Sequence, residues 1–362
     1  MKILTIVGAR PQFVKAAVLS REFKKHSQIK EVIVHTGQHF DKNMSDIFFE
    51  EMEIPKPDYN LNINGLSHGA MTGQMLEGIE KIIINEKPDY VLVYGDTNST
   101  LAGALAAKKL NYKVIHVEAG LRSFNLKMPE EINRILTDRI SDILFCPTDV
   151  AIENLKKEGF DNFNCKIYKS GDVMEDASIY YKDKAILNSN ILKNLNISPL
   201  NFILSTVHRA ENTDDINSLS SIINALNYIN KDFQVVVPLH PRTKKIILEN
   251  NIKVNFMVIE PLGYFDILML LANCKLVLTD SGGMQKEAFY FNKFCITLRD
   301  QTEWVELVKN GYNFISGANE DKILNIFNNI KLKTFPKKIN LYGDGKASAN
   351  ICNYLLKNYE QN

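Results

Sequence analysis

The sequence contains no long apolar run. Nowhere in its 362 residues is there a stretch of about 18 consecutive apolar residues, the length that a membrane-spanning helix requires. The apolar run between Lys2 and Gly8 is too short for the core of a signal peptide, because Arg10 soon interrupts it. We therefore expect a cytoplasmic protein that has no membrane partner.

The sequence also lacks an excess of charge of either sign. Lys and Arg number 43 and Asp and Glu 42, for a net charge of +1. Without a basic or acidic block, a nucleic-acid partner is not expected, and any cationic site should be local.

Cysteines are few, odd in number and free of C-x-x-C pairs, which predicts buried free thiols in a reducing compartment. They are Cys146, Cys165, Cys274, Cys295 and Cys352.

Several nucleotide and metal motifs are missing. G-x-G-x-x-G is absent, which disfavours a nicotinamide enzyme, and no Walker A motif supports a P-loop phosphotransferase. D-x-D, a motif of many metal-dependent glycosyltransferases, is absent too. Since His, Cys and carboxylate residues show no metal-ligand spacing either, no metal is expected.

Short apolar runs alternate with helical segments along the whole chain. This alternation predicts right-handed β-α-β units, hence an α/β protein with parallel sheets. The runs in the first half are 3–7, 32–36, 90–94, 114–117 and 143–146, and those in the second half are 202–207, 234–238, 257–259, 276–279 and 294–298.

Two such sheets predict two domains, in keeping with a prior of roughly 150 residues per domain. We expect an N-terminal Rossmann-like domain over 1–170, a C-terminal nucleotide-binding one over 171–345, and a last helix within 346–362 that packs back on the first. The segment 188–199 between the sheets is interpreted as a surface helix and loop. Polar residues follow the strands, at the sheet edge where ligands bind, so a ligand is expected between the domains. This layout resembles the GT-B fold.

The stretch Leu276–Phe289, LVLTDSGGMQKEAF, is the most informative strand-to-helix segment of the sequence. An apolar strand ends at Asp280, three small residues follow, and a helix begins at once. A turn without bulky side chains lets backbone N–H groups and a serine hydroxyl approach an anion at the positive end of a helix dipole. The alternative is an ordinary strand-to-helix turn.

A series of motifs resembles the non-hydrolysing UDP-N-acetylglucosamine 2-epimerase family from the first strand to the last helix. In chain order they are GARPQFVK (8–15), TGQH (36–39), YGDTNST (94–100), VEAGLRS (117–123), PEEINR (129–134), VHRAEN (207–212), HPR (240–242), DSGGMQKEA (280–288), LRDQTEW (298–304) and YGDG (342–345).

The resemblance implies reversible epimerisation at C2 of UDP-N-acetylglucosamine, giving UDP-N-acetylmannosamine for surface polysaccharide synthesis. The C2 proton is not acidic, so the family is taken to expel UDP and form 2-acetamidoglucal before UDP adds back. This route needs a stabilised diphosphate and carboxylates around C1 and C2. The resemblance implies a UDP-sugar substrate and no cofactor. Because members of the family usually form dimers, it also implies a homodimer.

For the diphosphate, the resemblance assigns contacts to Arg10, His208, Arg209 and the turn Ser281-Gly282-Gly283. A surface cation is the alternative for Arg10, although a helix start disfavours positive charge. Glu287 matches the family residue that holds the ribose hydroxyls, and a solvated helix glutamate is its alternative. His240 and Arg242 are weaker candidates for the same region.

For the chemistry, the resemblance assigns Asp96, Glu118 and Glu130 as acid or base carboxylates, with help from His208. Helix capping and first-turn charge are the alternatives for Asp96 and Glu130, and we interpret Glu131 and Asn98 in that way. Lys15 matches a family lysine near the site, although a lone lysine is more often solvated.

Two departures from the family pattern bear on the substrate and on regulation. Many members have T-E-R-P-E where this chain has T-E-W-V-E at 302–306, a variant that resembles epimerases of UDP-2,3-diacetamido-2,3-dideoxyglucuronate. That sugar is the alternative substrate. Gln74 stands where members with an allosteric site, which also uses Gln38 and His39, have an arginine. A GT-B glycosyltransferase, a hydrolysing epimerase and a non-catalytic sensor stay open as other classes.

Overall fold

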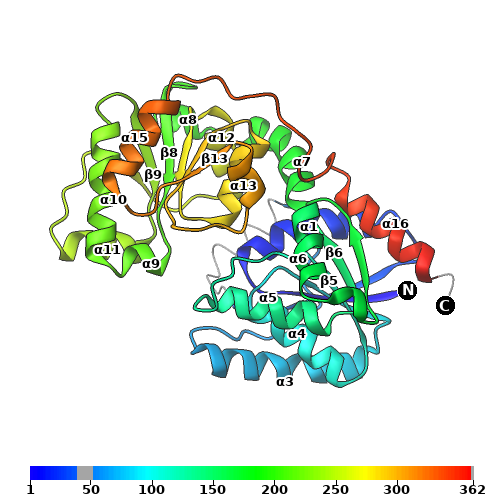
Figure 1. Ribbon diagram of the computed structural model, residues 1–362. Coiled ribbons are helices and arrows are strands. Elements are labelled where there is room, and N and C mark those ends of the chain that lie inside the picture. The colour runs from blue at the N-terminus through cyan, green and yellow to red at the C-terminus, as the bar shows by residue number, and fades with distance from the viewer. Residues whose placement is uncertain (39–51, 360–362) are drawn as a thin grey trace. The chain divides into compact units, whose positions relative to one another are not determined.

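The computed structural model describes residues 1–38 and 52–359, which form two compact units (Figure 1). Unit 1 comprises Met1–Ala177 and the residues from Asn340 onward, and unit 2 comprises Ser178–Ile339. Helix α7 (Val173–Asn188) begins in unit 1 and ends in unit 2. The last segment of the chain thus belongs to the same unit as the first.

Unit 1 is built on a seven-stranded sheet with the order β3-β2-β1-β4-β5-β6-β7, in which all paired strands are parallel. The order reverses next to β1, the arrangement of a Rossmann-like sheet. The strands are β1 (Lys2–Val7), β2 (Lys30–His35), β3 (Tyr59–Asn60), β4 (Tyr90–Tyr94), β5 (Lys113–Val117), β6 (Ile143–Cys146) and β7 (Lys166–Lys169).

Helices cover both faces of this sheet (Figure 1). Apolar side chains of α3 and α4 form one core with β1, β2 and β4, and α1 and α16 pack together on the other face, where Tyr354 meets Phe145 of β6 edge to face. Besides α7, the helices among the described residues of unit 1 are α1 (Arg10–Phe23), α3 (His68–Glu86), α4 (Asn98–Lys109), α5 (Pro129–Ile140), α6 (Asp149–Lys157), the 3₁₀ turn η1 (Phe160–Asn162) and α16 (Ala347–Tyr359).

Unit 2 is built on a six-stranded sheet with the order β10-β9-β8-β11-β12-β13, again with parallel pairs. Its central strands are buried on both faces, as expected where helices cover a parallel sheet. The strands are β8 (Phe202–Thr206), β9 (Gln234–Pro238), β10 (Met257–Ile259), β11 (Val277–Thr279), β12 (Cys295–Thr297) and β13 (Asn313–Ile315).

Two apolar clusters hold the helices of unit 2 on its sheet. One joins α10, α11 and α15 to the strands, and the other joins α8, α12 and α13 to them. The helices are α8 (Ile191–Asn194), α9 (Ala210–Thr213), α10 (Ile216–Ile229), α11 (Pro241–Glu249), α12 (Tyr264–Asn273), α13 (Gly282–Tyr290), α14 (Val305–Lys309) and α15 (Glu320–Ile330).

The expected α/β architecture is confirmed: two Rossmann-like units are present, and α16 returns to the first of them. The strands β3, β7 and β13 had no counterpart in the sequence analysis. The surface interpretation of 188–199 is wrong in part, because Ile191 of the one-turn helix α8 and the nearby Ile197 are buried in unit 2.

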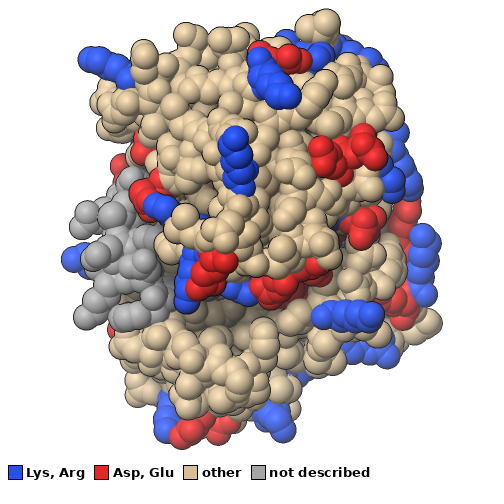
Figure 2. All heavy atoms as spheres, turned by 90° about the vertical axis from the view of Figure 1, so that its left-hand side faces the viewer, with Lys and Arg blue, Asp and Glu red and all other residues tan. Residues whose placement is uncertain are grey.

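Charges of both signs are present on the face of the molecule that Figure 2 shows. On the face shown in Figure 2, basic and acidic side chains are interspersed among uncharged ones. Among residues 1–38 and 52–359, no helix is both long and apolar enough to cross a membrane. The same part of the chain holds no group of three or more His, Cys, Asp or Glu side chains suited to a metal ion.

Candidate active site

Glu118 is held in a buried ion pair at the end of β5. Its carboxylate contacts the Lys15 ammonium of α1, and both side chains are buried. The backbone N–H groups of Glu118 and Ala119 both donate to the Phe145 carbonyl, at 3.1 and 3.0 Å, and Glu118 has φ of 75°. A non-glycine residue in this left-handed region costs about 1 kcal/mol or more. The strained residue lies where the chain leaves β5, and its backbone conformation places the Glu118 carboxylate beside Lys15.

Gly95 makes room for this ion pair. It follows β4 with φ of 62°, and a Cβ atom built on it would lie 3.1 Å from Lys15 Nζ and 3.2 Å from Glu118 Oε2. A side chain here would therefore crowd the ion pair and force its atoms to shift by a few tenths of an ångström. Lys15 is not the solvated lysine of the alternative interpretation.

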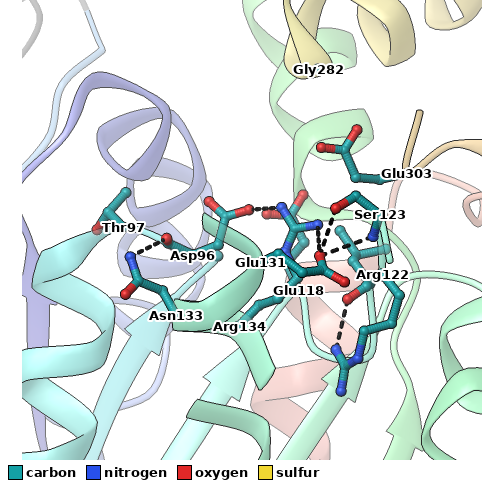
Figure 3. Close-up of polar contacts among 12 residues, drawn as sticks. Asp96, Thr97, Glu118, Arg122, Ser123, Glu131, Asn133, Arg134, Gly282 and Glu303 are labelled. Carbon is teal, nitrogen blue, oxygen red and sulfur yellow. Dashed lines mark hydrogen bonds and ion pairs between the residues drawn. The ribbon is translucent and has the colours of Figure 1, made fainter. Parts of the chain in front are cut away.

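Asp96, the next residue, is tied to α5. Its carboxylate forms an ion pair with Arg134, and its carbonyl accepts a bond from the Asn133 amide at 3.0 Å (Figure 3). Its side chain is 29% exposed, so the carboxylate is fixed and still reachable. Arg134 also donates to Glu131 at 2.9 Å and so links two carboxylates.

Glu131 is a buried anchor. It is fully buried, and its two oxygens accept bonds from Ser123 N, Ser123 Oγ and Phe124 N at 2.8–2.9 Å (Figure 3). Glu131 lies in the first turn of α5 as expected, but first-turn charge is not its whole role, because this carboxylate also fastens the loop between β5 and α5. The neighbouring Glu130, which follows Pro129 in the first turn of α5, is half-buried.

The capping interpretation of Asn98 is wrong. The N-cap of α4 is Thr97, whose hydroxyl accepts from Thr100 N. The buried Asn98 instead accepts from the Asn133 amide at 3.2 Å, and thereby joins α4 to α5. Gln38 accepts from Ser99 N and Oγ at 3.1 and 2.8 Å, while His39 lies outside the described residues.

Beneath these groups lies a buried cluster that the sequence analysis missed. Nε2 of His116, in β5, is 2.7 Å from the Gly95 carbonyl, and its Nδ1 is 2.7 Å from Asp138. Asp138 also accepts from Arg122 at 2.7 Å and from Gly120 N at 3.1 Å. The cluster thus holds the backbone on either side of Glu118 and just before Asp96. The sequence feature that could have indicated this cluster is His116, a histidine inside an apolar strand.

Asp280 fixes the backbone of loops in unit 2, as Asp138 does in unit 1. This fully buried carboxylate follows β11 and accepts the N–H groups of His208 and Arg209, each at 3.0 Å, and the Asn212 amide at 3.1 Å. Charge-assisted bonds of this kind are among the stronger ones. They fasten the loop after β8 to the turn after β11, while the His208 side chain stays 49% exposed.

The small-residue turn is a true helix start. Ser281 is the N-cap of α13, its hydroxyl accepting from Met284 N at 3.4 Å, and Gly282 and Gly283 form the first turn. Further along α13, Glu287 is buried and lies 3.3 Å from the Tyr264 hydroxyl, so its solvated alternative is wrong. Burial, and then the Glu287 charge, raise the pKa of Tyr264 well above its usual value.

The remaining candidates lie at helix starts. Arg10 is half-buried as the first residue of α1. His240 is the N-cap of α11, and the exposed Arg242 forms an ion pair with Asp214. The structure thus gathers Lys15, Asp96 and Glu118 around two loops of unit 1. In unit 2 it gathers His208, Arg209, the Ser281–Gly283 turn and Glu287.

The Asp138 cluster generates a stability prediction. Burial would raise the pKa of Asp138, but the hydrogen bonds and charges of His116 and Arg122 lower it below its usual value. An Asp138→Asn variant leaves the Arg122 cation and the His116 ring without their carboxylate, which should lower the free energy of unfolding by about 3 kcal/mol at neutral pH. Urea unfolding would measure this. In the control Asp149→Asn, which removes an exposed ion pair with Lys169, the loss should stay below about 1 kcal/mol.

The pH dependence of that difference follows from the direction of the shift. A lowered pKa in the folded state means that the stabilisation is fully present above the usual carboxyl value of about 3.9. It is lost as the pH falls through the folded value. The difference between wild type and Asp138→Asn should therefore be constant down to about pH 5 and shrink below about pH 4. A difference that grows on acidification would contradict this account.

Comparisons with known proteins agree on one family. The family model described as UDP-N-acetylglucosamine 2-epimerase matches residues 21–356. A UDP-2,3-diacetamido-2,3-dideoxy-D-glucuronate 2-epimerase of Pseudomonas aeruginosa is 56% identical over 99% of this chain and 100% of that protein. A UDP-N-acetylglucosamine 2-epimerase of Methanocaldococcus jannaschii is 44% identical over 98% of this chain and 99% of its own length.

Solved structures give the same result. The M. jannaschii UDP-GlcNAc 2-epimerase in complex with UDP-GlcNAc and UDP has a TM-score of 0.91 at 43% identity, covering 99% of this chain and 100% of that one. The Neisseria meningitidis UDP-GlcNAc 2-epimerase bound to UDP-GlcNAc has a TM-score of 0.89 at 33% identity, with coverage of 99% and 100%. The chain belongs to the UDP-N-acetylglucosamine 2-epimerase family.

Proposed function

We propose that this protein inverts C2 of a UDP-linked 2-acetamido sugar. The observation that carries the proposal is the pair of residue sets found in the two units. In unit 1, Asp96 and Glu118 follow strands β4 and β5, and Glu130 lies in the first turn of α5. In unit 2, α13 begins with a turn of small residues whose N–H groups suit an anion. A reaction that separates a sugar from a diphosphate and rejoins them needs both parts.

The proposed reaction is balanced without an external oxidant or reductant. The C1–O bond breaks and its electron pair leaves with the β-phosphate oxygen of UDP, while a carboxylate takes the C2 proton and a C1=C2 double bond forms. In the return step a proton is delivered to the other face of C2, and the UDP oxygen adds to C1. Only the configuration at C2 changes.

Each half of this chemistry is assigned to a set of residues. Asp96, Glu118 and Glu130 serve the proton transfers, with His208 assisting, and Lys15 holds Glu118 in place. Arg10, His208, Arg209 and the Ser281–Gly283 turn stabilise the departing diphosphate, since cations and a helix N-terminus favour developing negative charge. Glu287, fixed near Tyr264, holds the ribose hydroxyls.

The substrate favoured by similarity is the 2,3-diacetamido uronate. The P. aeruginosa relative named for this sugar is 56% identical, whereas the M. jannaschii UDP-N-acetylglucosamine epimerase is 44% identical. Trp304, in the T-E-W-V-E variant, supports the same choice. UDP-N-acetylglucosamine is the second candidate, supported by the solved structures that bind it.

Proton NMR in deuterated water tests both substrates. We expect conversion of UDP-2,3-diacetamido-2,3-dideoxyglucuronate to its C2 epimer with deuterium at C2, and slower or no conversion of UDP-N-acetylglucosamine. An Asp96→Asn variant should lower the rate by about 10²- to 10⁴-fold, the usual contribution of a general acid or base. Asp149→Asn, an exposed carboxyl of the same unit, should keep the wild-type rate.

Other outcomes of this experiment separate the alternatives. Release of free sugar and UDP would indicate hydrolysis. Turnover that appears only when an acceptor sugar is added would indicate a glycosyltransferase. If neither UDP-sugar changed, the proposed function would be contradicted.

We also propose that the protein is a homodimer joined through unit 1. Ile132 and Leu136 lie one turn apart on α5 and are 44% and 46% exposed, an apolar pair that a second copy could cover. Light scattering after size exclusion should give twice the 41.2 kDa chain mass. An Ile132→Glu, Leu136→Glu variant should be monomeric, whereas Leu248→Glu, on α11 of unit 2, should not. A monomeric wild type would contradict the proposal.

Location and pathway follow from the substrate. A UDP-sugar epimerase works where nucleotide sugars are made, so we propose a cytoplasmic protein whose product supplies surface polysaccharide synthesis. Cell fractionation should recover the protein in the cytosol. Recovery with the membrane or the medium would contradict this location.

A further inference from the structure

Trp304 is the only tryptophan of the chain and contacts the small-residue turn of unit 2. It lies just before α14, with 4% of its surface exposed. Its indole N–H donates to the Gly282 carbonyl at 2.9 Å. A buried aromatic side chain therefore bonds to the backbone of the turn that is proposed to hold the diphosphate.

The loop that carries Trp304 reaches the same turn by a second route. The Thr302 hydroxyl donates to Gln285 Oε1 at 2.7 Å, and the Gln285 amide donates in turn to the Ser281 carbonyl at 3.3 Å. Trp304 N donates to the Thr302 hydroxyl at 3.2 Å and closes the network. The carbonyls of Ser281 and Gly282 are thus both bonded to this network.

Because the peptide group is planar, a bond that fixes a carbonyl also fixes the direction of the N–H that follows it. In a planar trans peptide the C=O and the following N–H point in opposite directions. Fixing the carbonyls of Ser281 and Gly282 therefore directs the N–H groups of Gly282 and Gly283 away from the network, at a helix start whose first N–H groups have no helical acceptor. A Cβ atom on Gly283 would meet nothing within 4 Å, so this residue borders open space.

Lys286 fixes the indole ring itself. Its ammonium lies 4.1 Å from the centroid of the Trp304 ring, and the residue is 1% exposed. A cation over an aromatic face is attracted more strongly when it is removed from water. Since Lys286 lies one turn after Gly282 in α13, the indole is bound to this helix through its edge and through its face.

We propose that Trp304 is a positioning residue for the diphosphate. Its indole N–H holds the Gly282 peptide so that the N–H groups of the turn point at the phosphate oxygens before the ligand arrives. This inference rests on the proposed function, because it takes a nucleoside diphosphate as the ligand of the turn. As the only tryptophan, Trp304 also serves as an optical reporter at that turn.

The single tryptophan allows a test that removes only the N–H. Biosynthetic incorporation of 3-benzothienylalanine replaces the indole N–H by sulfur at Trp304 alone, and 7-azatryptophan, which keeps the N–H, is the matched control. By calorimetry, UDP should bind the benzothienyl protein about tenfold more weakly, since the Gly282 carbonyl then keeps only its bond within α13 and is no longer held by the indole N–H. UDP affinity of the azatryptophan protein should stay within about twofold of wild type. Uridine, which lacks the diphosphate, should bind all three proteins equally by ligand-observed NMR.

A Trp304→Phe variant gives a second route to the same result. It keeps a ring beside Lys286 without the N–H, so it should weaken UDP and leave uridine unchanged. In the wild type, UDP should shift the tryptophan emission and uridine should not.

The outcomes separate this inference from the proposed function. Equal UDP affinity of the benzothienyl and wild-type proteins would overturn the role of Trp304 while leaving the nucleotide site in place. An equal loss of UDP and uridine binding would also overturn it, because the effect would then not concern the diphosphate. A wild type that binds no UDP would contradict the proposed function, and the role of Trp304 with it.

Discussion

Buried carboxylates that accept backbone N–H groups are the constraint on which the candidate site residues of each unit depend. Asp138 accepts from Gly120 in unit 1, and Asp280 accepts from His208 and Arg209 in unit 2. Both aspartates are fully buried. Loops at the carboxyl edge of a parallel sheet leave N–H groups without strand partners, and burying such groups unpaired costs about 1–3 kcal/mol each. An aspartate at the sheet edge removes that cost and fixes the loop.

The charge of each buried aspartate is offset differently in the two units. Asp138 lies between Arg122 and His116, and Arg122 is itself paired with Glu158 at 2.6 and 2.8 Å. Asp280 relies on backbone and amide donors together with the half-exposed His208. A ligand anion at the unit 2 turn would therefore approach a histidine that a buried carboxylate already orients. In unit 1, Arg122 and His116 face the interior, and the carboxylates of Asp96 and Glu130 stay reachable.

The sequence predicted the architecture better than it predicted what the charged residues do. Strands such as Tyr90–Tyr94 were predicted with their bounds, and the final helix Ala347–Tyr359 lies within the predicted range 346–362, because apolar runs and helical periodicity are local properties. The edge strand β7, Lys166–Lys169, was missed because lysines at both ends interrupt its apolar pattern. Helix α7 crosses the division between the units, so no break in the chain marks that division.

The roles of Glu130 and Glu131 show why the functions of individual site residues could not be predicted from local sequence alone. The two residues are adjacent and chemically identical, and both open α5. Only tertiary partners distinguish them, since Glu131 is satisfied by Ser123, Phe124 and Arg134. Resemblance to a family assigned chemistry to Glu130, but nothing local could show that Glu131 anchors the loop beside it. The same holds for His116 and Trp304, whose partners are distant in sequence.

Preorganisation within each unit fits the chemistry proposed for the protein. Once the C1–O bond is broken, the glycal and UDP are separate molecules that must keep their orientations until they recombine. Loops fastened by Glu131 and Asp138 hold the carboxylates proposed to act on the sugar, and the network of Thr302, Gln285 and Trp304 holds the turn proposed to bind the diphosphate. Because these bonds are internal to each unit, neither half needs the intact substrate to keep its geometry.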